Sequence, residues 1–244
     1  MATNYVHNPL EGDKPELIID LEQAVGDLVS IIVVHKDRPA YLNLCLQSLA
    51  ICSQNASHEI IVVDNNSGPE TQEFLIDIQK DVKVVRNTKN IFWSDAVTAG
   101  IRHADPRSKY YIIMHSDVVI LNPSWIDLFV NVASSNNSGM VGLETGSYVV
   151  GKQKVDFVQE WCLLISKECY QKIGPWPSEL PMIGHSFIMT IKAQINGFRP
   201  QVMKNILAHH FKIFGIDIND YEQMTERAAK IIPKIYQQVQ ATQL

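Results

Sequence analysis

The sequence has no long hydrophobic run. Its apolar stretches reach about six residues, far below the ~20 that a membrane-spanning helix needs, and its polar N-terminus lacks the pattern of a signal peptide. We therefore expect a cytoplasmic protein. A basic and apolar stripe near the C-terminus leaves peripheral contact with a membrane as an alternative to a helix packed on its own domain. It comprises Arg227, Lys230, Ile231, Lys234 and Ile235.

Clustered cysteines and clustered basic residues are also lacking. The four cysteines form no C-x-x-C pair, which disfavours both a metal cage and a secreted disulfide framework. The formal net charge of -5, without runs of Lys and Arg, argues against nucleic acid as the main partner, because binding to a phosphate backbone needs a basic footprint. A small ligand with a bound cation is easier to reconcile with this charge.

Several nucleotide-binding and hydrolase motifs are missing as well. No G-x-G-x-x-G follows the first apolar run, and neither G-x-S-x-G nor H-E-x-x-H occurs. Gly146 to Lys152 spells G-x-x-x-x-G-K, but Gln153 stands where a phosphate-binding loop carries Ser or Thr, and the intervening Tyr148 to Val150 is strand-like. We interpret this match as chance.

What the sequence does contain is a series of short, β-branched apolar runs that stop abruptly at polar residues. Such runs are typical of buried parallel strands, and ligands of open α/β sheets bind just beyond the carboxyl ends of these strands. The runs and the residues that end them are Val29 to Val34 before His35-Lys36-Asp37, Ile60 to Val63 before Asp64-Asn65-Asn66, and Tyr111 to Met114 before His115-Ser116-Asp117.

The alternation of these runs with helical patterns predicts an α/β fold with a doubly wound, mostly parallel sheet. We expect an extension over 1–28, a main domain over 29–215 and a C-terminal helix over 216–244. Within the main domain, 29–143 is the nucleotide-binding half, and 144–215 is a mixed α+β half on the acceptor side.

Capping and breaking residues predict where several helices begin and end. The expected helices start after Asp37, at Ser67-Gly68-Pro69-Glu70, at Ser94 and after Asn122-Pro123, run from His185 to Asn196, and begin again at Asn219 with a break at Pro233.

The polar residues after the strands have two interpretations each when taken singly. His115-Ser116-Asp117 can present a carboxylate and an imidazole to a divalent cation, or it can be an ordinary polar exit from a strand. Asp64 can bind a ribose or a base edge, or it can start the turn that follows it.

Taken together, the motifs resemble those of family 2 glycosyltransferases with the GT-A fold. The resemblance covers about residues 29 to 215, and the order and spacing of its motifs carry it. They are Ser30 to His35 with Arg38-Pro39 and Leu42, Glu59 to Ser67, Asn87 to Asn90 before Ala96 and Gly100, His115 to Asp117, Cys162 to Ile165, Ile173 to Trp176, Gly197-Phe198, and His209-His210.

This resemblance implies a nucleoside-diphosphate sugar as donor, with Mn²⁺ or Mg²⁺ on its diphosphate, and a hydroxyl acceptor that belongs to a glycan. Asp117 matches the last aspartate of the family's D-x-D metal motif, His115 stands at the first, and His209 or His210 matches a late histidine of the metal site. The same resemblance places the nucleotide at the residues His35, Asp37, Asp64, Asp95 and Ser116.

The chain departs from the family where a catalytic base is expected. The usual Glu-Asp pair at the start of the helix before Gly197-Phe198 is replaced by His185-Ser186. Ser186 cannot accept a proton at neutral pH, whereas the imidazole of His185 can, so His185 is the first candidate base; a helix-start histidine without catalytic role is the alternative. The reserve candidates are Glu160, Asp156 and Glu179.

These expectations lead to three hypotheses. The first is an inverting, metal-assisted glycosyltransferase. The second is a non-catalytic nucleotide-sugar or glycan-binding protein of the same fold, which the lost acidic pair would suit. The third, a sugar-phosphate nucleotidyltransferase, ranks last because Lys36-Asp37-Arg38-Pro39 replaces the Gly-rich loop that it predicts.

Overall fold

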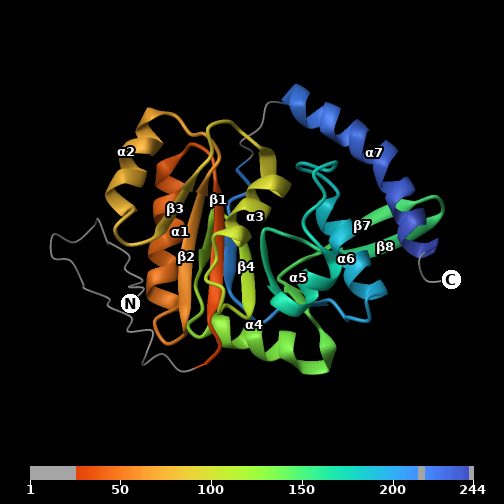
Figure 1. Ribbon diagram of the computed structural model, residues 1–244, viewed down its shortest axis with the longest axis horizontal. Coiled ribbons are helices and arrows are strands. Elements are labelled where there is room, and N and C mark those ends of the chain that lie inside the picture. Colours follow the sequence, from red (N-terminus) through yellow and green to blue (C-terminus); the bar gives the residue numbers. More distant parts are fainter. Residues whose placement is uncertain (1–25, 214–217, 242–244) are drawn as a thin grey trace.

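The structure is a computed structural model that describes residues 26–213 and 218–241. The expected extension over 1–28 therefore lies almost wholly outside the described residues. The remainder is built around one seven-stranded sheet (Figure 1), whose strand order is β10-β6-β9-β4-β1-β2-β3. The strands are β1 (Val29–His35), β2 (His58–Asp64), β3 (Lys83–Arg86), β4 (Tyr110–His115), β6 (Met140–Gly142), β9 (Cys162–Ser166) and β10 (Gln201–Val202).

The central strands form because their β-branched residues are buried on both faces of the sheet. Every residue of β1 and β2 is buried, as are the first five of β4. The parallel register pairs His35 with Asp64 and Val34 with His115, so the three polar exits lie at the same edge. β9 runs antiparallel to β4 and β6. The mostly parallel α/β architecture predicted from the sequence is confirmed.

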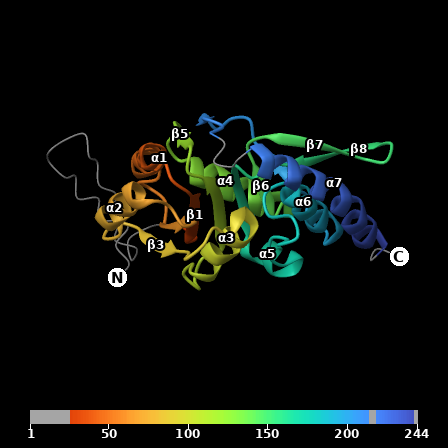
Figure 2. The ribbon, with the colours of Figure 1, turned by 90° about the horizontal axis from the view of Figure 1, so that it is seen from above.

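Helices cover both faces of the sheet (Figure 2). One face carries α1 (Pro39–Cys52), α2 (Pro69–Ile78) and α4 (Trp125–Ser134), and the other carries α3 (Phe92–Arg102), α5 (Lys167–Ile173) and α6 (His185–Ile195). α3 approaches the sheet closely at Gly100. A methyl group there would lie 2.4 Å from Ile32 Cγ2, so the C-terminal part of α3 packs directly on the sheet.

The smaller elements pack around α6 and along the carboxyl edge. β7 (Thr145–Val150) and β8 (Gln153–Val158) form a hairpin that projects beside α6 and α7 (Ile218–Ala241). Phe187 of α6 and Ile232 of α7 lie in the apolar cluster that joins these parts. β5 (Val118–Ile120) pairs antiparallel with β11 (Ala208–His210), which brings a late segment of the chain next to the end of β4.

Several local predictions differ from the structure. From its apolar pattern, the stretch from Val155 to Ile165 is expected to be a single strand. The structure has two strands there, because the chain turns between β8 and β9 and brings Gln159, Glu160 and Trp161 to the carboxyl edge. Asp37 does not cap α1. Its backbone is left-handed, and its carboxylate instead accepts a hydrogen bond from the Gly68 N–H.

Two helices also differ from expectation. α5 was not predicted, since its seven residues are too few to show a clear period. α7 continues through Pro233 instead of breaking there. Within the described ranges no helix is both long and apolar enough to cross a bilayer.

Candidate functional site

A cavity of about 810 Å³ opens at the carboxyl edge of the sheet. Its walls come from the residues that follow β1, β2 and β4, from the start of α3, from the β8–β9 turn, from the segment before α6 and from the residues after β11. A volume of this size is typical of ligand sites, and its place matches the rule for open α/β sheets. The predicted residues that line it are His35, Asp37, His115, Ser116, Asp117 and His210.

His115, Asp117 and His210 form a cluster that could hold a metal ion. One potential ligand atom from each residue lies within 4.8 Å of the others. Asp117 Oδ1 is 3.4 Å from His210 Nε2 and 3.9 Å from His115 Nδ1, and Asp117 Oδ2 accepts a hydrogen bond of 2.8 Å from the Ile213 N–H. Two imidazoles and one carboxylate suit a divalent transition metal such as Mn²⁺. The residues present therefore fit the metal that the sequence implies.

The pairing of β11 with β5 decides which histidine of the tandem pair belongs to the cluster. His210 lies opposite Val118 and faces the cavity, whereas His209 is exposed, because successive side chains of a strand point to opposite faces. Trp161 stacks on the His210 ring at 5.1 Å between centroids and donates its indole N–H to Glu144 at 2.7 Å. This outer contact fixes the orientation of the His210 ring.

Two of the three potential ligands, His115 and Asp117, have pKa values shifted toward the protonation states that bind a metal. Burial lowers the pKa of His115 to about 4, although Glu160 opposes the shift. For Asp117, burial raises the pKa, but hydrogen bonds from His210 and from the Ile213 N–H outweigh it and the net shift is downward. At neutral pH the His115 imidazole is thus neutral and Asp117 is a carboxylate, which are the forms that bind metals.

The end of β1 forms the neighbouring wall. His35 Nδ1 lies 2.9 Å from Ser116 Oγ, and His35 Nε2 is buried without a hydrogen-bond partner among the described residues. The Asp37 N–H donates to Ser67 Oγ, and Asp37 Oδ2 pairs with the Lys36 ammonium at 2.9 Å. These contacts hold the β1 and β2 exits together beside the metal cluster.

Asp64 and Asp95, both predicted to bind the nucleotide, are not among the described residues that line the cavity. Asp64 is 1% exposed; its carboxylate accepts from the Ser67 N–H at 3.0 Å and lies 3.4 Å from Arg86 Nε. Asp95 is exposed in the first turn of α3 and is not among the residues that line the cavity. Asp64 therefore supports the turn after β2, and binding of nucleotide by Asp64 and Asp95 stays a prediction.

Asn65, which sequence reasoning did not single out, lines the cavity next to Asp64. Its Oδ1 accepts from the Ile91 N–H at 2.9 Å, and its amide group donates to the Phe92 carbonyl at 3.1 Å. These bonds tie β2 to the start of α3. Lys212 and Trp93 also line the cavity without having been predicted, and only their positions in the fold reveal them.

The candidate base His185 is almost completely buried, at 1% exposed, and its ring is not part of the described cavity lining. Burial lowers its pKa, which Glu160 opposes. Glu160 itself does line the cavity, and its Oε1 lies 3.8 Å from His185 Nε2. The other reserve candidates, Asp156 and Glu179, are exposed and stand outside the lining.

Comparisons with known proteins identify the family and the fold of this chain. The family model "Glycosyl transferase family 2" matches residues 30–194, which include all three strand exits and the start of α6. The chain belongs to glycosyltransferase family 2. A curated relative, the "O-antigen biosynthesis protein RfbC" of Myxococcus xanthus, is 20% identical over 70% of this chain. The match covers 16% of that relative, so this family 2 chain corresponds to only a small part of it.

Solved structures of glycosyltransferases share the fold of this family 2 member. A mannosyltransferase of Pyrobaculum calidifontis, solved with GDP-Man and Mn²⁺, is 14% identical with a TM-score of 0.60, over 82% of this chain and 60% of that one. GalNAc-T7 with UDP, GalNAc and Mn²⁺ is 13% identical with a TM-score of 0.63, over 82% and 47%. TarS residues 1–349 of S. aureus are 17% identical with a TM-score of 0.54, over 72% and 58%.

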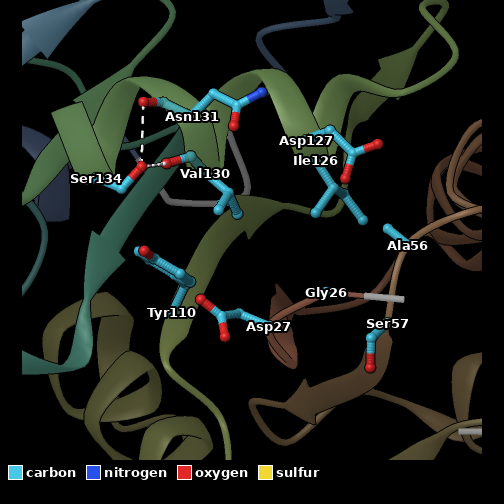
Figure 3. Close-up of a pocket in the computed structure, with 10 residues that line it drawn as sticks. All are labelled: Gly26, Asp27, Ala56, Ser57, Tyr110, Ile126, Asp127, Val130, Asn131 and Ser134. Atoms are coloured by element: carbon cyan, nitrogen blue, oxygen red, sulfur yellow. Dashed lines mark hydrogen bonds between the residues drawn. The ribbon is translucent and has the colours of Figure 1, made fainter. Parts of the chain in front are cut away.

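A second hollow, of about 390 Å³, lies at the opposite edge of the glycosyltransferase sheet (Figure 3). Asp27, Ser57 and Tyr110 line it from the amino ends of the strands, and Asn131 and Ser134 line it from α4. The Asp27 carboxylate is already paired with Lys109 at 2.6 Å. Since ligands of open α/β sheets bind at the carboxyl ends, we assign the candidate site of this family 2 chain to the larger cavity.

Burial of His35 should make the stability of the folded chain depend on pH. Burial lowers the pKa of His35 from 6.5 to about 4, so the unfolded chain binds the extra proton first as the pH falls. This contribution is complete above pH 6.5 and lost as the pH falls to about 4, on the order of 3 kcal/mol. The free energy of unfolding, measured with urea at several pH values between 6.5 and 4, should therefore fall less with decreasing pH in His35→Gln than in the wild type. The same fall in both proteins would show that His35 does not cause this pH dependence.

Proposed function

We propose that this chain transfers a sugar from a nucleoside-diphosphate sugar to a hydroxyl group of a glycan acceptor, with inversion at the anomeric carbon and with a divalent metal. The observation that carries the proposal is the cluster of His115, Asp117 and His210 in one cavity with His35 and Asp37. Membership of family 2 supports the reaction class, whereas donor, acceptor and stereochemistry belong to the proposal.

The metal cluster would hold Mn²⁺ or Mg²⁺. A bound divalent ion supplies electrostatic stabilisation of the diphosphate as it leaves the sugar. Two of its three protein ligands would be imidazole nitrogens, which suit Mn²⁺ better than Mg²⁺, an ion that prefers oxygen ligands. The Mn²⁺ bound to the P. calidifontis mannosyltransferase and to GalNAc-T7 supports this preference.

The rest of the cavity divides into a donor side and an acceptor side. His35, Asp37 and Ser116 would contact the nucleoside, because they stand at the exits of β1 and β4 next to the metal cluster. The Lys212 side chain, two residues beyond His210, would approach the diphosphate as a cation. Asp64 and Asp95 do not line the described cavity, so they would affect donor binding only indirectly, by positioning the residues that form the wall of the cavity next to the donor.

The acceptor would enter from the side formed by the β8–β9 turn and the segment before α6. Gln159, Glu160 and Ser186 line the cavity there. An inverting reaction needs the acceptor oxygen to approach the anomeric carbon from the side opposite the departing diphosphate, and a nearby group to accept its proton. The O-antigen biosynthesis protein RfbC, as a relative, supports a glycan as the acceptor.

A non-catalytic protein that binds nucleotide sugars is the second candidate function. The replacement of the family's acidic pair by His185-Ser186 favours it, since neither residue offers a carboxylate at that position. This alternative predicts binding of donor with no turnover, so one series of assays distinguishes the two.

A donor screen tests the proposal. With Mn²⁺ present, UDP- or GDP-sugars should raise the melting temperature of the protein, and the increase should be much smaller after the metal is chelated. At a free donor concentration of 100 times the Kd, the stabilisation is about 2.7 kcal/mol. Release of nucleoside diphosphate from one of these sugars should then be measurable. Stabilisation without release would support the non-catalytic alternative, and neither stabilisation nor release would contradict both.

A further inference from the structure

We infer that Glu160 replaces the missing acidic pair as the catalytic base of this chain. The inference rests on the proposed function and adds the identity of the group that accepts the proton. It starts from two facts: the helix position at which the family usually carries acids holds His185-Ser186, and a carboxylate from another part of the chain lies beside that position.

The β8–β9 turn delivers this carboxylate. Glu160 follows β8 and precedes Trp161, which stacks on the metal-cluster residue His210. The side chain of Glu160 is 21% exposed and lines the cavity, whereas His185, 3.8 Å away, is 1% exposed. Of these two neighbours, only Glu160 can therefore touch an acceptor hydroxyl.

The surroundings of Glu160 hold it at the acceptor side of the metal cluster. The Trp93 ring packs edge-on against His115, at 4.2 Å between centroids, and stacks at 6.4 Å with His185. The Ser186 hydroxyl donates a hydrogen bond to the Glu160 carboxylate. Ser186 stands where the family usually has an acid, and here it helps to position Glu160.

A role for Glu160 as a fourth metal ligand is the competing interpretation. The group whose ligand atoms lie within 4.8 Å of one another contains His115, Asp117 and His210, and among the described residues Glu160 does not join it. Its nearest partners are His185, 3.8 Å away, and Ser186, which are not members of that group, although the charge of Glu160 also acts on His115. The geometry thus favours proton transfer over metal binding.

The step assigned to Glu160 is a single proton transfer. The acceptor oxygen forms a bond to the anomeric carbon while the bond from that carbon to the diphosphate oxygen breaks, and its electron pair leaves with the diphosphate. The acceptor proton passes to a carboxylate oxygen of Glu160 and from there to solvent. The cavity opens to solvent at this wall, since Glu160 is partly exposed.

Glu160→Gln tests the assignment with a nearly isosteric change. Turnover, measured as release of nucleoside diphosphate from the donor found in the screen, should fall by about 10²–10⁴-fold, the range for loss of a general base. Binding of Mn²⁺ and of nucleotide should stay within about twofold, which a lost metal ligand would not allow. Glu179→Gln, an exposed acid outside the described lining, should turn over like the wild type.

Two further variants distinguish loss of the Glu160 carboxylate from a change in folding. Glu160→Asp keeps a carboxylate and should exceed Glu160→Gln in turnover. Adding Ser186→Asp to Glu160→Gln places an acid at the hydrogen-bonded neighbour and should restore turnover at least about tenfold over Glu160→Gln alone.

The outcomes separate this inference from the proposed function. Wild-type turnover that Glu160→Gln leaves unchanged would overturn the base assignment and leave the transferase intact. A loss of Mn²⁺ binding in Glu160→Gln would overturn it in favour of a ligand role. A wild type that binds Mn²⁺ and nucleotide sugar but releases no nucleoside diphosphate would overturn both.

Discussion

Replacing Asp117 with asparagine is expected to abolish most of the metal-dependent binding of nucleotide and to lower turnover by about 100- to 1,000-fold. Asp117 is the one carboxylate of the metal cluster, and Oδ1 lies within 4 Å of both histidines. Losing its charge removes several kcal/mol of stabilisation from the departing diphosphate, at about 1.4 kcal/mol for each tenfold in rate. Calorimetric titration with Mn²⁺, then with UDP or GDP, measures the binding.

Asp127→Asn is the matched control for this substitution. Asp127 is an exposed carboxylate on α4, next to the hollow at the other edge of the sheet. The control should bind Mn²⁺ and nucleotide like the wild type. If Asp117→Asn also binds both like the wild type, the cluster does not hold the metal of this site.

The tandem histidines offer the second large effect, with a control built into the chain. His210→Ala should weaken Mn²⁺ binding at least about 100-fold, since losing an outer-shell group already costs ~10–100-fold. His209→Ala should leave it unchanged, because His209 is exposed and its ring contacts Phe211 instead of the cavity. The two variants remove the same side chain from adjacent positions, and they differ in which face of β11 they occupy.

The same titration measures both histidine variants. Equal losses in His209→Ala and His210→Ala would mean that the β5–β11 pairing, rather than the His210 ring, is what binding requires. No loss in His210→Ala would remove this residue from the metal site.

Much of the fold could be predicted because local pattern and tertiary environment agree there. The central residues of β1, β2 and β4 are apolar and many are β-branched, and the sheet buries them on both faces. The run from Val155 to Ile165 was misread as one strand, since apolar periodicity does not reveal a turn that carries Gln159 and Glu160 to the site.

The location of the site could be predicted from the ends of the strands. Which neighbouring side chain faces the cavity could not be predicted, because this depends on the direction in which each side chain points. Parallel register brings His35 and His115 to the same edge, which the apolar runs already implied. The turn after β2 points Asp64 toward Ser67 and Arg86 and leaves Asn65 at the cavity, a difference of one residue that no pattern encodes.

The choice between His209 and His210 also needed the structure. Two adjacent histidines are equivalent in the sequence until the pairing of β11 with β5 gives each a face. The choice of base is similar, because Glu160 and His185 are far apart in the chain and only the packing of α6 against β8 brings them to 3.8 Å.

We expect His115, Asp117 and His210 to bind a metal ion through one carboxylate and two imidazole nitrogens. Pulsed electron paramagnetic resonance of Mn²⁺ bound to the protein detects coupling to the nitrogens of coordinated histidines. We predict strong ¹⁴N coupling in the wild type and in His209→Ala, with less in His210→Ala and in His115→Ala. Tightly bound Mn²⁺ without nitrogen coupling, or coupling that persists unchanged in both His115→Ala and His210→Ala, would contradict the account.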